Sequence, residues 1–346
     1  MNKLVLKNGL SFEGISFGAD TSAAGEVVFS TGMMGYPESL TDPSYKGQIL
    51  ILTYPLVGNY GIPDKKFWEA DKIMISGLIV STYIDTPFHF QSKKTLGEWL
   101  KEEGIPALEI KDTRFLTQTI REKGTVLGKL TNGKDIDFYD PDNENLVEKV
   151  STTKTTVSEV SKNAKNILLI DCGAKRNIQR VLSERNVNVI TVPWNFDLTT
   201  SEYKDKIDGA VISNGPGNPK FVKETIENIK KLFKLNIPIL GVCLGNQLLS
   251  LAAGGDTGKL KYGHRSQNQP CIMVGTNRCY ITTQNHGFEV KKIPKDFKPW
   301  FINANDGSNE GIIHKNRPIM SVQFHPEATP GPEDTEWIFD YFLEKI

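Results

Sequence analysis

The chain has few cysteines, no net charge and no long apolar run. Four cysteines among 346 residues provide no disulfide framework, which agrees with a reducing compartment. The 41 basic and 41 acidic residues cancel, which argues against a dedicated nucleic-acid surface. No stretch of 18 apolar residues occurs, so the sequence predicts no transmembrane helix and no membrane partner.

Targeting signals are also missing from the first residues. The opening segment, MNKLVLKNGLSFEG, has an alternating strand pattern, with neither a secretory apolar core nor an arginine-rich amphipathic presequence. We therefore expect a cytoplasmic protein. Because a strand pattern begins directly after Met1 and a helical pattern ends at Ile346, we also expect an independent subunit rather than an excised domain.

The apolar pattern divides the chain into two domains, as its length suggests. Residues 1–150 show short strands and then helical patterns around 95–103 and 112–123, which indicates a smaller α+β domain. Residues 151–165 are polar and predict a linker. Residues 166–346 contain near-continuous apolar strands separated by helical patterns. This texture is typical of an α/β domain with a mainly parallel sheet and helices on both faces.

One cysteine lies where such a strand turns into a helix. In IPILGVCLGNQ (237–247), Gly241 and Gly245 leave room for a sharp turn with Cys243 at its apex. The turn presents the sulfur and leaves the backbone N–H of Leu244 free to bind a developing oxyanion. The positive end of the following helix favours the thiolate, the form that attacks. We therefore predict that Cys243 is a nucleophile.

A histidine at the end of a second strand provides a base. The buried strand pattern PIMSVQF (318–324) delivers His325 at its end, with Glu327 two positions later. Residues i and i+2 of an extended chain point the same way, so Glu327 can hold one ring nitrogen while the other faces Cys243. We predict His325 as the base and Glu327 as its orienting group. The histidines without a carboxylate at i+2 on a strand end are His89, His264, His286 and His314.

A structural interpretation competes with the catalytic one. A lone cysteine at the end of an apolar strand is more often a small core residue. The flanking glycines, the helix start and the His-x-Glu segment at a second strand end favour catalysis. The remaining cysteines, Cys172, Cys271 and Cys279, show no metal-ligand spacing, so we expect ordinary buried thiols and no metal site.

Residues 241–247 spell G-x-C-x-G-x-Q, which resembles the class I, triad-type glutamine amidotransferases. The segment SNGPGNP (213–219), which follows the strand pattern DGAVIS, looks like the second oxyanion loop of that family. The resemblance implies that the N–H of Gly217 joins that of Leu244 at one oxygen, each donor being typically worth about 3 kcal/mol in the barrier. The same glycines would also suit a structural turn that only leads into the next helix. One turn can both connect strand to helix and provide an oxyanion donor.

Within that class, the chain most resembles the small subunits of carbamoyl-phosphate synthetases. The resemblance covers almost the whole chain and is carried by MMGYPESLTDPSY (33–45), QNHGF (284–288) and NANDGSNEG (303–311). By this resemblance, the residues that hold glutamine are Ser44, Gly215, Gly217, Leu244, Gln247, Asn285, Gly287 and Phe288. An amide side chain and backbone groups can bind the α-amino and α-carboxylate groups without a net charge.

The chain shows no nucleotide site of its own. The segment GGDTGKL (254–260) is one residue short of a phosphate-binding loop, and Leu260 stands where Ser or Thr is required. The resemblance therefore implies a hetero-oligomer with a large synthetase partner that uses ATP and bicarbonate, and no cofactor in this chain. The first domain is expected to dock that partner and, through Ser44, to complete the glutamine pocket.

Three other functions stay open at this point. A glutaminase subunit of another pathway, such as anthranilate or aminodeoxychorismate synthase, would share the cysteine turn at 241–247 but commonly lacks a domain like residues 1–150. A non-catalytic scaffold that regulates a synthetase would not need Cys243, His325 and Glu327. A cysteine peptidase would share these three residues but would need an open cleft.

Overall fold

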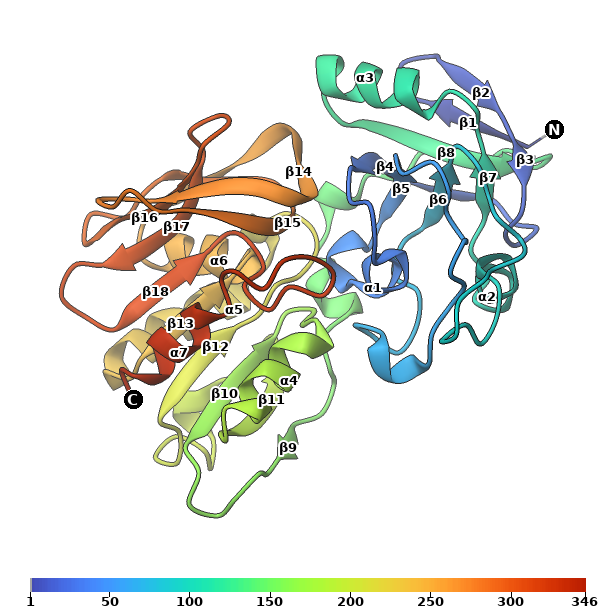
Figure 1. The fold of residues 1–346 in the computed structure, drawn as a ribbon. Coiled ribbons are helices and arrows are strands. Elements are labelled where there is room, and N and C mark those ends of the chain that lie inside the picture. Colours follow the sequence, from blue (N-terminus) through green and yellow to red (C-terminus); the bar gives the residue numbers. More distant parts are fainter. Residues whose placement is uncertain (1) are drawn as a thin grey trace. The chain divides into compact units, whose positions relative to one another are not determined.

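The computed structural model describes residues 2–346 and divides them into two compact units (Figure 1). Unit 1 ends at Asn143, and unit 2 runs from Glu144 to Ile346. Each unit has its own mixed sheet, of eight and ten strands respectively, with helices packed against it. The predicted α/β class, with a separate N-terminal domain, is confirmed. Within residues 2–346 no helix is both long enough and apolar enough to cross a membrane.

Unit 1 is built on a sheet in the order β2-β1-β8-β4-β5-β6-β7-β3. The strands are β1 (Asn2–Leu6), β2 (Ser11–Glu13), β3 (Ile15–Ser16), β4 (Ala23–Ser30), β5 (Gln48–Leu52), β6 (Gly77–Val80), β7 (Ala107–Glu109) and β8 (Val126–Asn132). Strands β4 to β7 run parallel, and the apolar segments of β5 and β6 are buried, as central parallel strands require.

The helices of unit 1 come between its strands rather than after them. They are α1 (Tyr36–Thr41), α2 (Leu96–Glu102) and α3 (Thr113–Lys123), and the last two confirm the predicted helical segments. Helix α2 begins with a capping box, in which the Thr95 side chain accepts from the Glu98 N–H while the Glu98 carboxylate accepts from the Thr95 N–H.

Unit 2 contains a ten-stranded sheet in the order β15-β14-β16-β17-β18-β13-β12-β10-β11-β9. Its strands are β9 (Thr156–Ser158), β10 (Asn166–Asp171), β11 (Asn188–Pro193), β12 (Gly209–Ile212), β13 (Ile239–Val242), β14 (Asp256–Met273), β15 (Cys279–Lys292), β16 (Phe297–Asn303), β17 (Asn309–His314) and β18 (Ile319–Val322). Strands β11, β10, β12, β13 and β18 run parallel, as predicted. Strands β14 to β17 add an antiparallel half.

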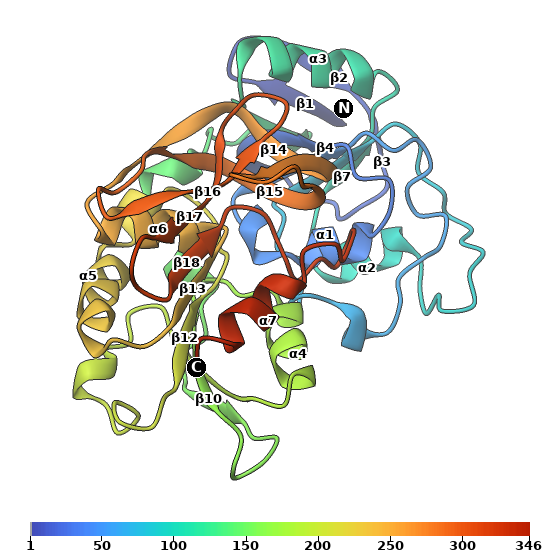
Figure 2. The ribbon, with the colours of Figure 1, turned by 60° about the vertical axis from the view of Figure 1, so that its left-hand side comes forward.

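Helices cover both faces of the parallel strands (Figure 2). The helices are α4 (Arg176–Glu184), α5 (Lys223–Leu232), α6 (Leu244–Ala252) and α7 (Trp337–Leu343). Alternate residues of β10 face opposite cores: Leu168 and Ile170 pack with α5 and α6, whereas Ile167 and Leu169 pack with α4 and α7. This two-sided burial explains why the strands read as continuous apolar runs.

The predicted linker is instead part of unit 2. The division lies at Asn143 and Glu144, and Val147 is buried in a core of unit 2. Strand β9 pairs antiparallel with β11, and the Thr152 N–H donates to Asp171 Oδ2 at 2.7 Å. The predicted boundary at residue 150 and the linker 151–165 therefore differ from the structure. Backbone pairing attaches this segment, and backbone hydrogen bonds leave no mark in a polar composition.

Candidate functional site

The carboxyl ends of the parallel strands gather the predicted residues of unit 2 on one rim. Strands β13 and β18 pair in parallel with Val242 opposite Val322, and the Cys243 N–H donates to the Val322 carbonyl at 2.8 Å. The segments that follow these strands, with Cys243 and His325, therefore start side by side. In open α/β sheets this rim is where ligands bind.

Cys243 occupies a strained turn, as the sequence predicts. Its φ of 53° and ψ of −102° lie outside the regions that side chains favour. The turn needs both neighbouring glycines: a Cβ on Gly241 would lie 2.6 Å from the Gly245 carbonyl oxygen, and one on Gly245 would lie 2.1 Å from the Ile212 oxygen. The structure thus holds the cysteine at the start of α6 by close packing of backbone on backbone.

The sulfur is buried but has polar neighbours. Cys243 is 2% exposed, and its Sγ lies 3.7 Å from the Asn285 carbonyl oxygen and 3.7 Å from Gln323 Nε2. Gln323 Oε1 in turn accepts from Asn246 Nδ2 at 3.0 Å and from Gln247 Nε2 at 3.2 Å. The sulfur therefore lies in a hydrogen-bonded layer rather than in hydrocarbon. Gln323 was not predicted as a neighbour of the sulfur. Its position two residues before His325 on the same segment was the signal that could have indicated it.

His325 and Glu327 form a buried pair. His325 Nδ1 lies 2.7 Å from Glu327 Oε1, and the two residues are 1% and 0% exposed. The backbone N–H of His325 donates to the Thr283 carbonyl at 2.9 Å, which fixes the backbone beside the ring. Within the described chain, His325 Nε2 has no hydrogen-bond partner. One ring nitrogen is thus oriented by a carboxylate, and the ring also interacts with Cys243, so the other nitrogen can exchange a proton there, as the predicted base requires.

Neighbouring charges set the ionisation of this pair. Burial lowers the pKa of His325, but the charges of Glu327 and Cys243 outweigh burial and raise the pKa to about 10. Burial raises the pKa of Glu327, whereas the charges of Lys175 and His325 bring it down to about 2. The carboxylate is therefore ionised and the imidazole ring holds a proton at neutral pH.

Lys175 is the residue near this pair that sequence analysis missed. It is 2% exposed, and its Nζ lies 3.1 Å from Glu327 Oε1 and donates to the Ala328 carbonyl. The Asn177 side chain donates to the backbone carbonyl of Glu327, so two side chains hold the backbone at Glu327 and Ala328. Lys175 lies in the loop between β10 and α4. A lysine just beyond the carboxyl end of a parallel strand was the signal that could have identified it.

Lys175→Met is expected to destabilise the protein in a pH-dependent way. Removing one partner of a buried ion pair typically costs about 3–5 kcal/mol. The folded-state pKa of Glu327 is lowered, so its stabilising contribution is present above the ordinary pKa of a glutamate and is lost as pH falls toward 2. Urea unfolding at pH 7, 5 and 4 should show the deficit of Lys175→Met shrinking with acidification. Lys206→Met, at an exposed lysine, is the control, and a deficit that stays constant with pH would contradict this role.

The predicted oxyanion donors lie at two loop ends of unit 2. Leu244 is the first residue of α6, where backbone N–H groups have no partner inside the helix. Gly217 follows β12, has a φ of 83°, and therefore adopts a conformation that favours glycine. Gly215 approaches the backbone so closely that a Cβ would lie 2.0 Å from the Cys172 oxygen. These loops can bring bare backbone close to a ligand.

The predicted glutamine-binding residues lie in the loop after β12, on α6, on β15 and in unit 1. Gln247 Nε2 donates to the Phe288 carbonyl at 2.9 Å, which joins α6 to β15. Asn285 and Gly287 belong to the same strand, and the carbonyl of Asn285 is in contact with the sulfur. Ser44 belongs to unit 1, in the short 3₁₀ helix Pro43–Tyr45, where its N–H donates to Asp42 Oδ1 at 2.9 Å.

Two family models match the chain. The model described as "Glutamine amidotransferase class-I" matches residues 168–345. The model described as "Carbamoyl-phosphate synthase small chain, CPSase domain" matches residues 4–130. The first covers the parallel strands and the candidate site, and the second covers most of unit 1.

Curated relatives match over 99% of the chain. It is 45% identical to the "Carbamoyl phosphate synthase arginine-specific small chain" of Neurospora crassa, of which it covers 79%. It is 49% identical to the "Multifunctional protein CAD" of Squalus acanthias and covers 16% of that protein. It is 44% identical to the "Carbamoyl-phosphate synthase [ammonia], mitochondrial" of Mus musculus and covers 23% of it. The chain thus spans less than a quarter of the length of the two larger relatives.

Proposed function

Because the chain belongs to the carbamoyl-phosphate synthase small-chain family and carries a class I glutamine amidotransferase domain, we propose that it is a glutaminase. It hydrolyses L-glutamine to glutamate and ammonia, and it delivers the ammonia to a large synthetase subunit for ATP-dependent synthesis of carbamoyl phosphate. ATP and bicarbonate bind to that partner, and this chain needs no cofactor for the hydrolysis. The two chains work as a hetero-oligomer.

One observation carries the proposal: a chain of interactions that ends at a strained cysteine. Lys175 lies 3.1 Å from Glu327, Glu327 lies 2.7 Å from His325, and His325 interacts electrostatically with Cys243. Lys175 favours the ionised form of Glu327, and Glu327 favours the protonated form of His325, the ring next to Cys243. Nucleophile, base and orienting group require this order of neighbours. A cysteine that served only for packing would not need a φ of 53°.

The proposed reaction has two steps. In the first, the Cys243 thiolate attacks the δ-carbonyl carbon of glutamine, and the N–H groups of Leu244 and Gly217 hold the oxyanion. The protonated His325 ring gives its proton to the departing nitrogen, which leaves as ammonia, and a γ-glutamyl thioester remains on Cys243. In the second, His325 takes a proton from water, whose oxygen attacks the thioester. Glutamate leaves, its new carboxyl group loses a proton to solvent, and the Cys243 thiolate is restored beside the protonated His325 ring.

The glutamine pocket is proposed to use neutral groups. The Gln247 amide and the backbone of Asn285, Gly287 and Phe288 bind the α-amino and α-carboxylate groups, and Gly215 lets the backbone approach. Gln247 and Phe288 are already joined by a hydrogen bond of 2.9 Å. Such a preformed site spends little free energy on ordering when the substrate binds.

A non-catalytic scaffold is the second candidate function. The relative from Mus musculus is named for ammonia, so membership of the family does not by itself establish glutamine use. Cys243, with its strained turn and charged neighbours, distinguishes the two candidates. A glutaminase of another pathway is disfavoured because the small-chain model matches residues 4–130.

A labelling experiment tests the proposal. A glutamine analogue with an electrophilic carbon at the δ-position should modify Cys243 at least about 100-fold faster than Cys279, which is exposed and not buried as predicted. Excess glutamine should protect Cys243, whereas an excess of a peptide substrate should not. Equal slow labelling at all four cysteines would indicate a scaffold, and protection by peptide would indicate a peptidase.

A further inference from the structure

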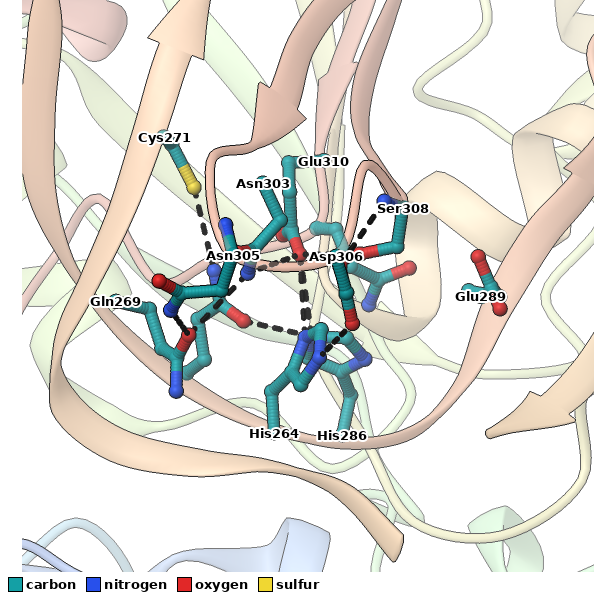
Figure 3. Close-up of polar contacts among 12 residues, drawn as sticks. His264, Gln269, Cys271, His286, Glu289, Asn303, Asn305, Asp306, Ser308 and Glu310 are labelled. Atoms are coloured by element: carbon teal, nitrogen blue, oxygen red, sulfur yellow. Dashed lines mark hydrogen bonds and ion pairs between the residues drawn. The ribbon is translucent and has the colours of Figure 1, made fainter. Parts of the chain in front are cut away.

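Two histidines and a glutamate meet in the antiparallel half of unit 2 (Figure 3). His264 on β14 and His286 on β15 are directly opposed in the strand register, and Glu310 comes from β17. The three residues are 6%, 5% and 0% exposed, and one possible ligand atom from each lies within 4.8 Å of the other two. This cluster is separate from the pair formed by His325 and Glu327.

Each histidine has one ring nitrogen already engaged by an acceptor. His264 Nε2 lies 2.8 Å from the carboxylate oxygen Asp306 Oδ2, and His286 Nδ1 lies 2.8 Å from the carbonyl oxygen of Phe288. Both partners accept, so both of these nitrogens carry the proton. A histidine that binds a metal usually donates its other N–H to a carboxylate or a backbone carbonyl in this way. When the rings are neutral, as metal-bound imidazoles are, the lone pairs therefore lie on His264 Nδ1 and His286 Nε2.

These lone pairs face acceptors rather than donors. His264 Nδ1 lies 3.3 Å from Glu310 Oε1, and His286 Nε2 lies 4.0 Å from the same oxygen and 3.1 Å from Gln284 Oε1. The Gln284 Nε2 group is occupied elsewhere, because it donates to Thr282 Oγ1 at 3.1 Å and to Cys271 Sγ at 3.3 Å. In the neutral tautomers both rings present lone pairs to oxygens, which a positive centre between them would relieve. A protonated His264 would instead donate from Nδ1 to Glu310 Oε1, 3.3 Å away, and a bound cation would displace that proton.

Two buried atoms of the cluster have no hydrogen-bond partner within residues 2–346. They are His264 Nδ1 and Glu310 Oε2. The hydrogen bonds that Glu310 Oε1 accepts from Asn303 Nδ2 and Ser308 Oγ are long, at 3.3 and 3.4 Å, and His264 Nδ1 lies 3.3 Å from the same oxygen. A buried carboxylate normally satisfies both oxygens, because leaving one without a partner costs about 1–3 kcal/mol or more. Both unsatisfied atoms belong to the same small volume.

We propose that His264 Nδ1, His286 Nε2 and the Glu310 carboxylate bind a divalent zinc ion. Zinc binds imidazole nitrogen and carboxylate oxygen at about 2.0–2.2 Å, which places tetrahedral ligands about 3.3 Å apart. The separation of 3.3 Å between His264 Nδ1 and Glu310 Oε1 already has this value, and that of 4.0 Å from His286 Nε2 requires a small rotamer adjustment. Two imidazoles and one carboxylate are typical zinc ligands.

The ion would join three strands directly behind the candidate site. His286 follows Asn285, whose carbonyl is in contact with Cys243 Sγ, and precedes the segment that Gln247 binds. A zinc ion would fix β15 against β14 and β17 at this point. The spacing of the cysteines predicts no metal site. The three ligands are separated by 22 and 24 residues, and no short motif marks them.

Metal content of the full-length chain tests the proposal. The chain is purified without a polyhistidine tag and without chelator, and its zinc is quantified by mass spectrometry. We expect about one zinc per chain. His264→Ala and Glu310→Gln should bind zinc at least about tenfold more weakly, and Asp306→Asn, at a half-exposed position, should weaken binding by about 10- to 100-fold. His314→Gln, on the same strand as Glu310, should keep the metal.

The catalytic thiol must be excluded as the zinc ligand. The same titration in a Cys243→Ser background should give an unchanged stoichiometry, and cobalt(II) bound in place of zinc should show no sulfur-to-metal charge-transfer absorption. In this background zinc should also raise the melting temperature, an effect that His264→Ala should lose. Stoichiometric zinc in both His264→Ala and Glu310→Gln, or no zinc binding by the parent chain, would overturn the proposal.

Discussion

Replacing Cys243 with serine is expected to abolish glutamate release from glutamine, lowering kcat by about 10⁴- to 10⁶-fold. A serine hydroxyl at this position is a far weaker nucleophile than a thiolate, because it does not ionise beside a ring that already holds a proton. The turn itself should be unchanged, since the close contacts that define it involve Gly241 and Gly245 and not the sulfur. Glutamate release is measured on the chain assembled with its large partner.

The same assembled complex provides the discriminating control for Cys243→Ser. If the chain only generates ammonia, synthesis of carbamoyl phosphate from added ammonium should continue at the parental rate. Cys279→Ser, at the exposed cysteine, should leave both activities unchanged. Retention of glutaminase activity in Cys243→Ser would refute the proposed nucleophile, and loss of the ammonium-dependent activity would instead indicate a damaged interface.

The approach of Cys243 and His325 could be predicted because a parallel sheet makes it a consequence of strand order. Apolar runs identify β13 and β18, and the residues that follow parallel neighbours lie on one rim whatever their separation in sequence. The pairing of His325 with Glu327 was also predicted, but from the geometry of an extended chain. Strand β18 instead ends at Val322, and a turn closed by the Ala328 N–H donating to the His325 carbonyl at 3.2 Å brings the two side chains together. The observed distance of 2.7 Å between their side chains agrees with the predicted pairing.

The position of Lys175 just beyond β10 indicates the rim but not its partner, and the histidine cluster has no such signal. Lys175 reads as a solvent-exposed residue before a helix, and its burial depends on Glu327, which lies 152 residues later. Strands β14 and β15 have polar sequences with register shifts, so they lack the alternation that identifies a strand. His264 and His286 are opposed only because of that pairing. Contacts that tertiary structure alone creates leave no periodic signal.

Glu327→Gln is expected to lower kcat by about 10³- to 10⁴-fold with little change in KM. The amide removes the charge that, with Cys243, holds the pKa of His325 near 10. Only Cys243 then opposes the effect of burial, so the pKa of His325 is lower than in the parent, and the ring loses at a lower pH the proton that it must give to ammonia. The residual activity should therefore decline with rising pH at a lower pH than in the parent, whose decline is expected only as pH approaches about 10.

A pH profile separates this orienting role from simple destabilisation. The variant leaves Lys175 beside a neutral amide, so its stability should fall as well, and activity is compared at a temperature where circular dichroism shows the chain folded. Glu327→Asp keeps the charge and should retain the parental pH profile at reduced kcat, whereas Glu333→Gln, at an exposed glutamate, should behave as the parent. A uniform loss of activity at every pH in Glu327→Gln would mean that the carboxylate acts only through packing. A displaced profile, recovered in Glu327→Asp, would establish that the charge on this buried side chain keeps the proton on His325.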